Sequence, residues 1–199
     1  KKTMQQDIDF SNNSWLDVAN GALALISADL LQSLGGEGTI ESKYIHVLMP
    51  KALEQVYSIL PLDDISQWVQ LTRSTGGANI GSSYSYAYDL PKRCATVREV
   101  KTEPGDSEFQ VVKNAVLSDA EAVNIRYISL PSTPEAMPYY AKSLMITLLA
   151  SMLAGPISHD ATMVSTLKAD YQSQLGNCLA FRKLTRHSDS YMDTGKEWN

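Results

Sequence analysis

Cys94 and the three histidines are the side chains whose chemistry could most readily serve catalysis or metal binding. A cysteine nucleophile needs a general base, and the histidine nearest to Cys94 along the chain is the distant His46. His159 and His187 are equally scattered, and no His-Glu-x-x-His motif indicates a zinc site. Cys94 and Cys178 match no metal-ligand spacing. We therefore expect no catalytic residue, no metal and no cofactor, and we interpret Cys94 as a small, half-buried strand residue.

Carboxylates and glycines offer two further kinds of site. Asp17 and the pair Asp63-Asp64 could work as acids or bases, although exposed loop carboxylates are the common case. Two glycine-rich segments read GGEGT, at residues 35 to 39, and TGGANIGSS, at residues 75 to 83. Neither follows a strand and opens a helix with a lysine, so a phosphate-binding loop is not indicated.

Three tyrosines alternate along one short segment, at Tyr84, Tyr86 and Tyr88. Alternation places them on the same face of a strand. Such a face could stack bases, but basic residues do not flank it. An aromatic core face or a protein interface is therefore favoured, because tyrosine is enriched at interfaces.

The composition is that of an ordinary globular protein. The chain has 199 residues, of which 44% are hydrophobic and 20% charged, so one domain or one domain with an insertion is expected. A net charge of -5 argues against a large phosphate-neutralising surface. The longest apolar stretch, residues 145 to 157, is interrupted by Gly155-Pro156 and is too short to span a bilayer. No signal peptide is recognisable, so we expect synthesis in the cytoplasm, free thiols and no membrane partner.

The elements that position these residues follow from the hydrophobic period. Apolar residues at spacings of three and four predict a helix over residues 15 to 34, ended by Gly35-Gly36, and a second helix over residues 42 to 60. Pro50 lies inside the second pattern and predicts a kink or a break there. Pro61 is expected to end that helix.

From Ile65 the period changes to two. The segments ISQWVQLT, YSYAYDLP, ATVREVKT, EFQVVKN and AVNIRYISL are strand candidates separated by turn residues. Their connections are too short for crossovers, which favours antiparallel pairing. Leu90-Pro91 is expected to end one strand, because proline cannot donate to the ladder.

After Pro131 the helical period returns. A central helix with a Ser or Thr cap is expected to stop at Gly155-Pro156, and Ser158 is the candidate cap of the final helix. We therefore predict an α+β fold, mainly α. A helical bundle is formed by residues 15 to 62 and 134 to 187, with an antiparallel β-module at residues 64 to 130 inserted in it. An extended tail without helical period follows at residues 188 to 199.

The order of the motifs resembles one known family. A helical pair, GALALISADLLQSL and YIHVLMPKALEQV, precedes YAYDLPKRCATVREV and then IRYISLPSTPEAMPYYAKSLMITLLASMLAGPIS. This order is similar to the tail tubular protein A family, the head-to-tail adaptors of short-tailed phages, over residues 21 to 186. The positions that fit the family pattern are Leu90, Pro91, Cys94, Val97, Tyr127, Pro138, Ala141, Leu144, Leu149, Ala150 and Ile157. The W-x-F-A strand often found after the second helix is represented only by Trp68, in a shifted context, and the segment SNNSWLDVANG has no counterpart.

The resemblance implies a structural protein of the virion tail, not an enzyme. About a dozen copies would form a homo-oligomeric ring between the portal protein and a tail nozzle similar to tail tubular protein B, with tail fibres as a further partner. Genomic DNA would pass through the lumen without sequence-specific binding. Two alternatives stay open: a tail-associated cell-wall hydrolase, which needs paired carboxylates, and a cytosolic α+β ligand-binding or regulatory domain.

Two interfaces follow from the resemblance and the residue types together. Tyr84, Tyr86 and Tyr88 are candidates for the contact with a neighbouring subunit or the nozzle. Tyr191, Met192 and Trp198 are apolar residues in a polar tail, and similar adaptors direct this segment towards the portal. We therefore interpret these three as candidate portal contacts, with a tail folded back on its own bundle as the alternative.

Overall fold

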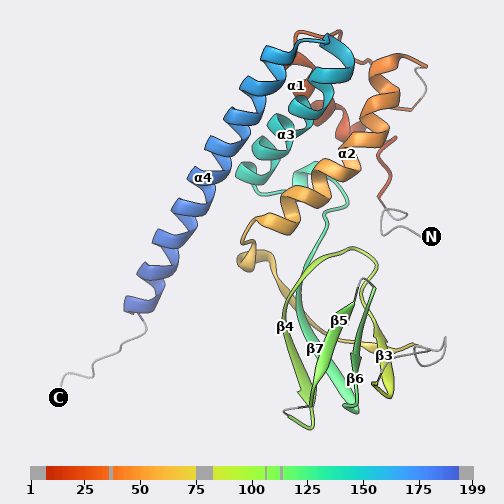
Figure 1. The fold of residues 1–199 in the computed structure, drawn as a ribbon, viewed down its shortest axis with the longest axis vertical. Helices are drawn as coiled ribbons and strands as arrows, with labels where there is room; N and C mark the ends of the chain where they lie inside the picture. Colours follow the sequence, from red (N-terminus) through yellow and green to blue (C-terminus); the bar gives the residue numbers. More distant parts are fainter. Residues whose placement is uncertain (1–7, 36–37, 75–82, 106, 113, 193–199) are drawn as a thin grey trace. The chain divides into compact units, whose positions relative to one another are not determined.

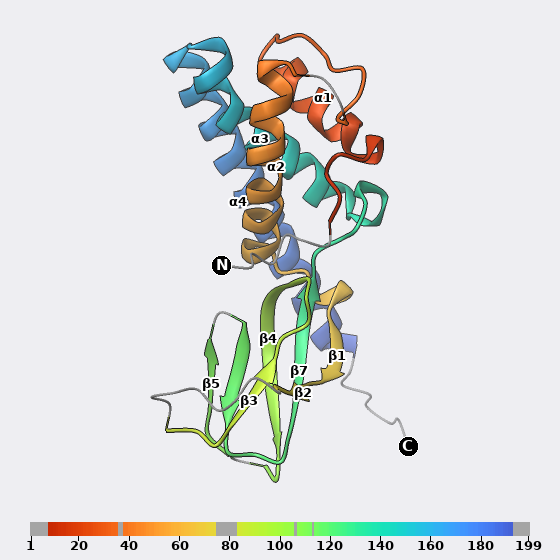
Figure 2. The same ribbon diagram turned by 90° about the vertical axis from the view of Figure 1, so that its right-hand side faces the viewer.

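A computed structural model describes residues 8–35, 38–74, 83–105, 107–112 and 114–192, with side chains as far as Ala180. The chain divides into two compact units (Figures 1 and 2). The β unit comprises Leu62–Pro131, and the helical unit comprises Ile8–Pro61 together with the chain from Ser132 onward. Four α-helices and two antiparallel sheets confirm a mainly-α α+β fold over the described ranges.

The first helix, α1 (Leu16–Leu25), follows a 3-10 turn at Asn13–Trp15 and ends nine residues before the predicted Leu34 (34 − 25). Ser27 takes the left-handed conformation with φ 54°, and the amide of Ala28 donates to the Leu23 carbonyl at 3.1 Å. This pattern of bonds is a Schellman motif, which ends the helix. The apolar spacing that predicted a longer helix continued through Leu30 and Leu34, of which Leu34 is buried from the following loop and Leu30 is 56% exposed.

The second helix, α2 (Ile40–Ile59), begins at Thr39, whose hydroxyl accepts a hydrogen bond from the Ser42 amide. Of the predicted kink or break at Pro50, the break does not occur, because α2 continues through this buried residue. Its last bond joins the Leu60 amide to the Val56 carbonyl, and Pro61 then follows as expected. The buried stripe comprises Ile45, Met49, Ala52, Leu53, Val56 and Tyr57.

The third helix, α3 (Tyr139–Ser158), follows a 3-10 turn at Pro134–Ala136 and contacts each of the other three helices. By length and composition α3 could cross a membrane, but ten of its residues are buried in the bundle, which explains its composition. The predicted stop at Gly155-Pro156 is wrong, since the helix continues to Ser158. It ends at His159, which has a left-handed φ of 53°.

The last helix, α4 (Ala161–Met192), is capped by Asp160 and not by Ser158. The Asp160 carboxylate accepts hydrogen bonds from the amides of Thr162 and Met163, at 2.8 and 3.1 Å. The helix runs five residues beyond the predicted end at residue 187 (192 − 187), and residues 193 to 199 of the predicted tail lie outside the described residues.

The β unit contains a 3-10 turn at Asp63–Ile65 and two antiparallel sheets. One sheet has the order β1-β7-β4 and the other the order β2-β3-β6-β5, which confirms the predicted antiparallel pairing. The strands are β1 (Gln67–Gln70), β2 (Thr72–Arg73), β3 (Tyr86–Asp89), β4 (Cys94–Glu103), β5 (Phe109–Val112), β6 (Ala115–Ser118) and β7 (Ala122–Ser129). Strand β6 was not predicted. Strands β1 and β2 are separated only by Leu71, so one stretch of chain serves both sheets.

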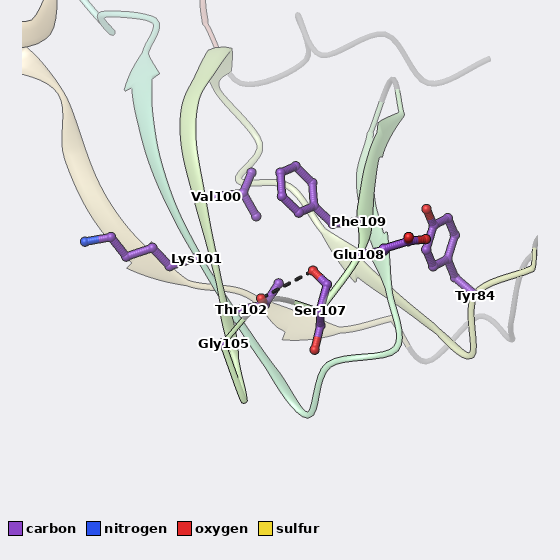
Figure 3. A pocket seen from close by; sticks show the side chains of 8 residues that line it. All are labelled: Tyr84, Val100, Lys101, Thr102, Gly105, Ser107, Glu108 and Phe109. Atoms are coloured by element: carbon purple, nitrogen blue, oxygen red, sulfur yellow. Dashed lines mark hydrogen bonds between the residues drawn. The ribbon is translucent and has the colours of Figure 1, made fainter.

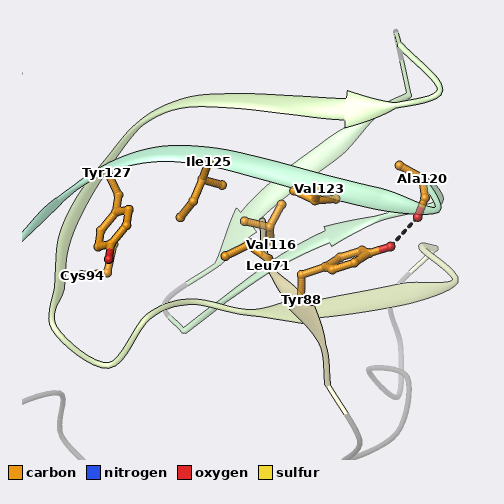
Figure 4. Packing of buried hydrophobic residues seen from close by; sticks show 8 residues of the cluster. All are labelled: Leu71, Tyr88, Cys94, Val116, Ala120, Val123, Ile125 and Tyr127. Atoms are coloured by element: carbon orange, nitrogen blue, oxygen red, sulfur yellow. Dashed lines mark hydrogen bonds between the residues drawn. The ribbon is translucent and has the colours of Figure 1, made fainter. Parts of the chain in front are cut away.

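A single hydrophobic cluster lies between the two sheets (Figure 4). It comprises Leu71, Tyr88, Cys94, Val116, Ala120, Val123, Ile125 and Tyr127. Asp89 ends β3 directly before Leu90-Pro91, as predicted, and Cys94 starts β4 as a small strand residue that is buried and not half-buried.

Candidate interaction sites

The three alternating tyrosines lie in three different environments. Tyr88 is buried, with only 1% of its surface exposed, and its hydroxyl donates a hydrogen bond to the Ala120 carbonyl. The interface prediction is therefore wrong for Tyr88, because its ring is part of the core (Figure 4). Tyr86 is 37% exposed, and Tyr84, which precedes β3, is half-buried. Only Tyr84 and Tyr86 keep surface that a partner could contact.

Arg73 organises the surface around Tyr86. Its guanidinium carbon lies 3.9 Å from the centroid of the Tyr86 ring, which is within the range of a cation–π contact. The same side chain donates to the Tyr88 hydroxyl at 3.2 Å and to the Glu121 carbonyl at 2.9 Å. The exposed tyrosine is thus held beside a fixed arginine, a pair of residue types enriched at protein interfaces.

A groove of about 820 Å³ opens between β4 and β5 (Figure 3). Val100 and Phe109 point towards each other across it, and the Lys101 side chain points away from it. At its closed end the Thr102 hydroxyl donates to the Ser107 carbonyl at 3.4 Å. The complete lining is Tyr84, Val100, Lys101, Thr102, Gly105, Ser107, Glu108 and Phe109.

The strand registers explain why this side of the β unit is open. Val111 pairs with Val116, and directly paired residues share a sheet face, so Val111 belongs to the inner face. Yet Val111 is 44% exposed and Phe109 45% exposed, whereas Val116 is fully buried. The inner face of the second sheet therefore loses its cover at β5, the last strand.

The outer face of the β1-β7-β4 sheet presents a second aromatic surface. Trp68 is 46% exposed, and the Lys101 ammonium lies 4.4 Å from its ring centroid. Glu99 pairs with Arg126 at 3.4 Å and with Lys101 at 3.7 Å. Such exposed ion pairs contribute little stability, so this face is a charged surface around one tryptophan.

Cys94, His46 and His159 each have different surroundings, and the His187 side chain lies outside the described residues. Cys94 is buried, and the loss of solvation raises the pKa of its thiol to about 11, which suppresses the nucleophilic thiolate. His46 lies in the helical unit, where its ring contacts the Leu34 carbonyl at 2.8 Å, and exposed His159 ends α3. In the described part of the chain, no three His, Cys, Asp or Glu residues are placed to hold a metal ion.

The predicted carboxylates belong to two different elements, α1 and a 3-10 turn. Asp17 lies in the first turn of α1, where a negative charge favours the helix. Asp63 and Asp64 form part of a 3-10 turn, and the Asp63 carboxylate lies 4.0 Å from the Arg98 guanidinium. These carboxylates therefore have structural surroundings of their own.

The helical unit has a groove of about 630 Å³ that sequence reasoning did not anticipate. Its apolar side chains come from all three helices, Leu48 on α2, Leu148 and Met152 on α3 and Val164 on α4, and one lysine lies on α2 and another on α4. The lining residues are Leu48, Lys51, Gln55, Leu148, Ser151, Met152, Gly155, Val164, Lys168, Tyr171 and Gln172. The groove combines side chains from three helices, so no single segment of the sequence could indicate it.

The predicted portal contacts fall at the end of the chain. Tyr191 and Met192 lie in the last turn of α4 instead of an extended tail, and Trp198 lies outside the described residues. No protein-family model matches the chain, and no curated protein matches it either.

Proposed function

We propose that this chain is the subunit of a head-to-tail adaptor, a ring of about a dozen copies in the virion tail of a short-tailed phage. The ring joins the portal protein to the tail nozzle and lets the genome pass. This role is structural, with no catalytic step. The proposal rests on the resemblance in motif order, which is an argument by analogy.

The observation that supports the proposal best is where the resembling residues lie. Cys94 and Tyr127 belong to the β-unit core, and Ala141, Leu144 and Leu149 are buried on α3. Core positions constrain residue type through packing, so a pattern carried by them describes a fold more reliably than surface residues would. The order of helices, antiparallel β unit and helices also agrees with the family pattern.

The charge balance suits a channel wall. The chain carries 22 acidic and 17 basic residues, and an acidic wall attracts no phosphate backbone. DNA can pass through a channel without binding to its wall when the wall is acidic.

A cell-wall hydrolase is less compatible with the two grooves. Glycoside hydrolysis uses two carboxyl groups on opposite sides of the scissile bond. Among their lining residues, the β-unit groove has one carboxylate, Glu108, and the helical groove has none. Neither groove supplies the pair, which favours the structural role.

Electron microscopy of the full chain mixed with the portal protein of the same virus tests the proposal directly. We expect a ring of this chain, coaxial with the portal ring. A chain that remains unbound to portal rings at micromolar concentration, while its circular dichroism shows it folded, contradicts the adaptor role.

The end of the chain provides a second test. Deleting residues 188 to 199 removes Tyr191, Met192 and Trp198, and we expect the truncated protein to stay folded but to attach weakly to portal-containing heads. Replacing the same residues with a Gly-Ser segment of equal length is the matched control for chain length. Normal attachment of the truncated protein rules out portal docking through this segment.

A further inference from the structure

The last residue of α1 and the turn that follows it expose two leucines and a carboxylate to solvent. Leu25 is 47% exposed and Leu30 is 56% exposed, with exposed Asp29 between them. We call these three residues the knob. Exposed leucines are unfavourable on an isolated protein in water, and a group of them often marks a site of contact with another protein.

The knob is held in one conformation by hydrogen bonds at both ends. The Schellman motif fixes residues 23 to 28. Beyond it, the Asn20 side chain donates to the Leu31 carbonyl at 3.0 Å and accepts from the Leu31 amide at 2.9 Å. A surface fixed before binding loses less conformational entropy when it binds.

The groove between α2, α3 and α4 complements the knob in chemistry. Leu148, Met152 and Val164 contribute apolar side chains, and the ammonium groups of Lys51 and Lys168 contribute two positive charges. No carboxylate is among its lining residues. A ligand with apolar side chains and a negative charge therefore suits this groove better than a neutral or cationic one.

The knob and the groove belong to opposite sides of α3. On its α1 side, a Cβ added to Gly21 would lie 3.4 Å from the Ile146 side chain, so α1 packs closely at Ile146. At about 100° per residue, Leu148 and Met152 lie roughly 160° and 120° from Ile146 around the helix. The groove thus faces away from α1, and one copy cannot insert its knob into its own groove.

We infer that the knob of one copy docks into the groove of the next copy, with Leu25 and Leu30 against the apolar lining and Asp29 between Lys51 and Lys168. Two different surfaces on opposite sides make a head-to-tail contact, which closes into a ring when the rotation per copy allows. The pairing of knob and groove does not depend on the proposed adaptor ring, and only the closure of successive contacts into a ring does. Within that ring, the inference identifies which two surfaces neighbouring copies share.

An exposed stripe on α2 enlarges this surface. Ile40, Tyr44 and Val47 lie on one face of the helix at 61%, 38% and 56% exposure. The same face continues at Leu48 and Lys51, which line the groove. The docked copy would therefore cover apolar surface that is otherwise in contact with water.

Disulfide trapping tests the polarity of the contact. In a Cys178→Ser background, which leaves buried Cys94 as the remaining native thiol, the double variant Leu30→Cys/Met152→Cys should oxidise to a ladder of multimers. A mixture of the two single variants should stop at dimers, and each single variant alone should stay monomeric. Ile59→Cys with Met152→Cys is the matched control, since Ile59 is exposed but lies outside the knob.

Charge reversal tests the chemistry in the uncrosslinked full chain. Asp29→Lys alone, or Lys51→Glu with Lys168→Glu, should each weaken self-association by about tenfold in sedimentation velocity. The triple variant, which exchanges the charges of both surfaces, should restore association. No cross-linking of the double variant, dimers from Leu30→Cys alone, or unchanged association after charge reversal would each overturn the contact.

These outcomes are distinct from those that decide the adaptor role. A ring seen on the portal without knob-to-groove cross-links rejects this contact but keeps the adaptor. Head-to-tail multimers that never bind a portal protein keep the contact and reject the adaptor.

Discussion

The helical unit and the β unit have hydrophobic cores of different size. In the helical unit α3 alone contributes ten buried residues, eight of them apolar, and the fully buried Trp15 and Tyr57 belong to the same unit. The β unit has a cluster of eight buried residues, in which Tyr88 needs a hydrogen bond to the Ala120 carbonyl to be buried without cost. The smaller core also stops at β5, where Phe109 and Val111 stay exposed.

This difference predicts which unit tolerates the loss of a buried side chain without unfolding. Many interchangeable apolar contacts hold the helical unit, so the loss of one should leave the others in place. The β unit depends on a few contacts between residues far apart in sequence, such as the Leu71 amide with the Val123 carbonyl. Single substitutions should therefore unfold the β unit more readily than the helical unit.

The largest effect is expected from Tyr88→Ala. Removing this buried ring should lower the free energy of unfolding by about 4 kcal/mol, which is most of what a unit of this size commonly has. We expect the β unit to unfold while the circular dichroism signal of the helices persists. Limited proteolysis with mass spectrometry should locate the new cleavage sites within residues 62 to 131.

Tyr86→Ala is the matched control, since this residue lies two positions away on the same strand and is exposed. It loses only the contact with Arg73, worth about 0.5–1 kcal/mol. Equal proteolysis of both variants would contradict the assignment of Tyr88 to the core.

Leu149→Ala probes the helical unit in the same way. The cavity left by this fully buried leucine should lower the free energy of unfolding by about 3 kcal/mol, measured by urea denaturation followed at 222 nm. The variant should still be folded in water at 25 °C. Val47→Ala, on an exposed face of α2, should change stability by less than about 0.5 kcal/mol. Global unfolding of Leu149→Ala in water would remove the contrast between the two units.

The buried thiol of Cys94 makes the β unit sensitive to alkaline pH. Burial raises the pKa of this thiol from 9.0 to about 11, so the unfolded chain ionises first and stability falls as pH rises through this interval. The shift corresponds to about 2 to 3 kcal/mol once pH exceeds the folded value. The stability that the thiol contributes is fully present below about pH 9.

Comparing wild type with Cys94→Ala isolates this effect from the tyrosines that titrate nearby. The difference in unfolding free energy between the two proteins should be constant up to about pH 8 and should change in favour of the alanine variant above it. Parallel pH profiles from pH 7 to 11 would show that the thiol is solvated in the folded protein.

The smallest effect is expected at His159, between α3 and α4. Its φ of 53° strains a residue with a side chain, so His159→Gly should stabilise the helical unit by about 1 kcal/mol. His159→Ala keeps the strain and should change little. Thermal unfolding measures both, and a lower melting temperature for the glycine variant would mean that the imidazole itself stabilises the turn.

The fold class was predictable because the hydrophobic period changes from 3.6 to 2 and back. The ends of the elements were less predictable. Leu30 and Leu34 continued the helical spacing although Ser27 had already ended α1, and α3 passed through Pro156. Strand β6 is only four residues long and gave no separate signal.

The candidate sites show the same limit. The alternation of tyrosines correctly predicted a strand. It did not predict that Tyr88 is buried while Tyr86 is exposed. Which tyrosine is buried depends on β6 and β7, which lie about 30 residues further along the chain. The groove of the helical unit needs three helices, so no local pattern could predict it.

Leu71 lies where one stretch of chain passes from the first sheet to the second. Its buried side chain belongs to the common core, and its amide bonds to Val123 between the two short strands. Neither sheet can therefore detach without disturbing the other. Amide hydrogen exchange in both sheets should accordingly report one shared opening event, so the β unit behaves as a single cooperative foldon despite its two sheets.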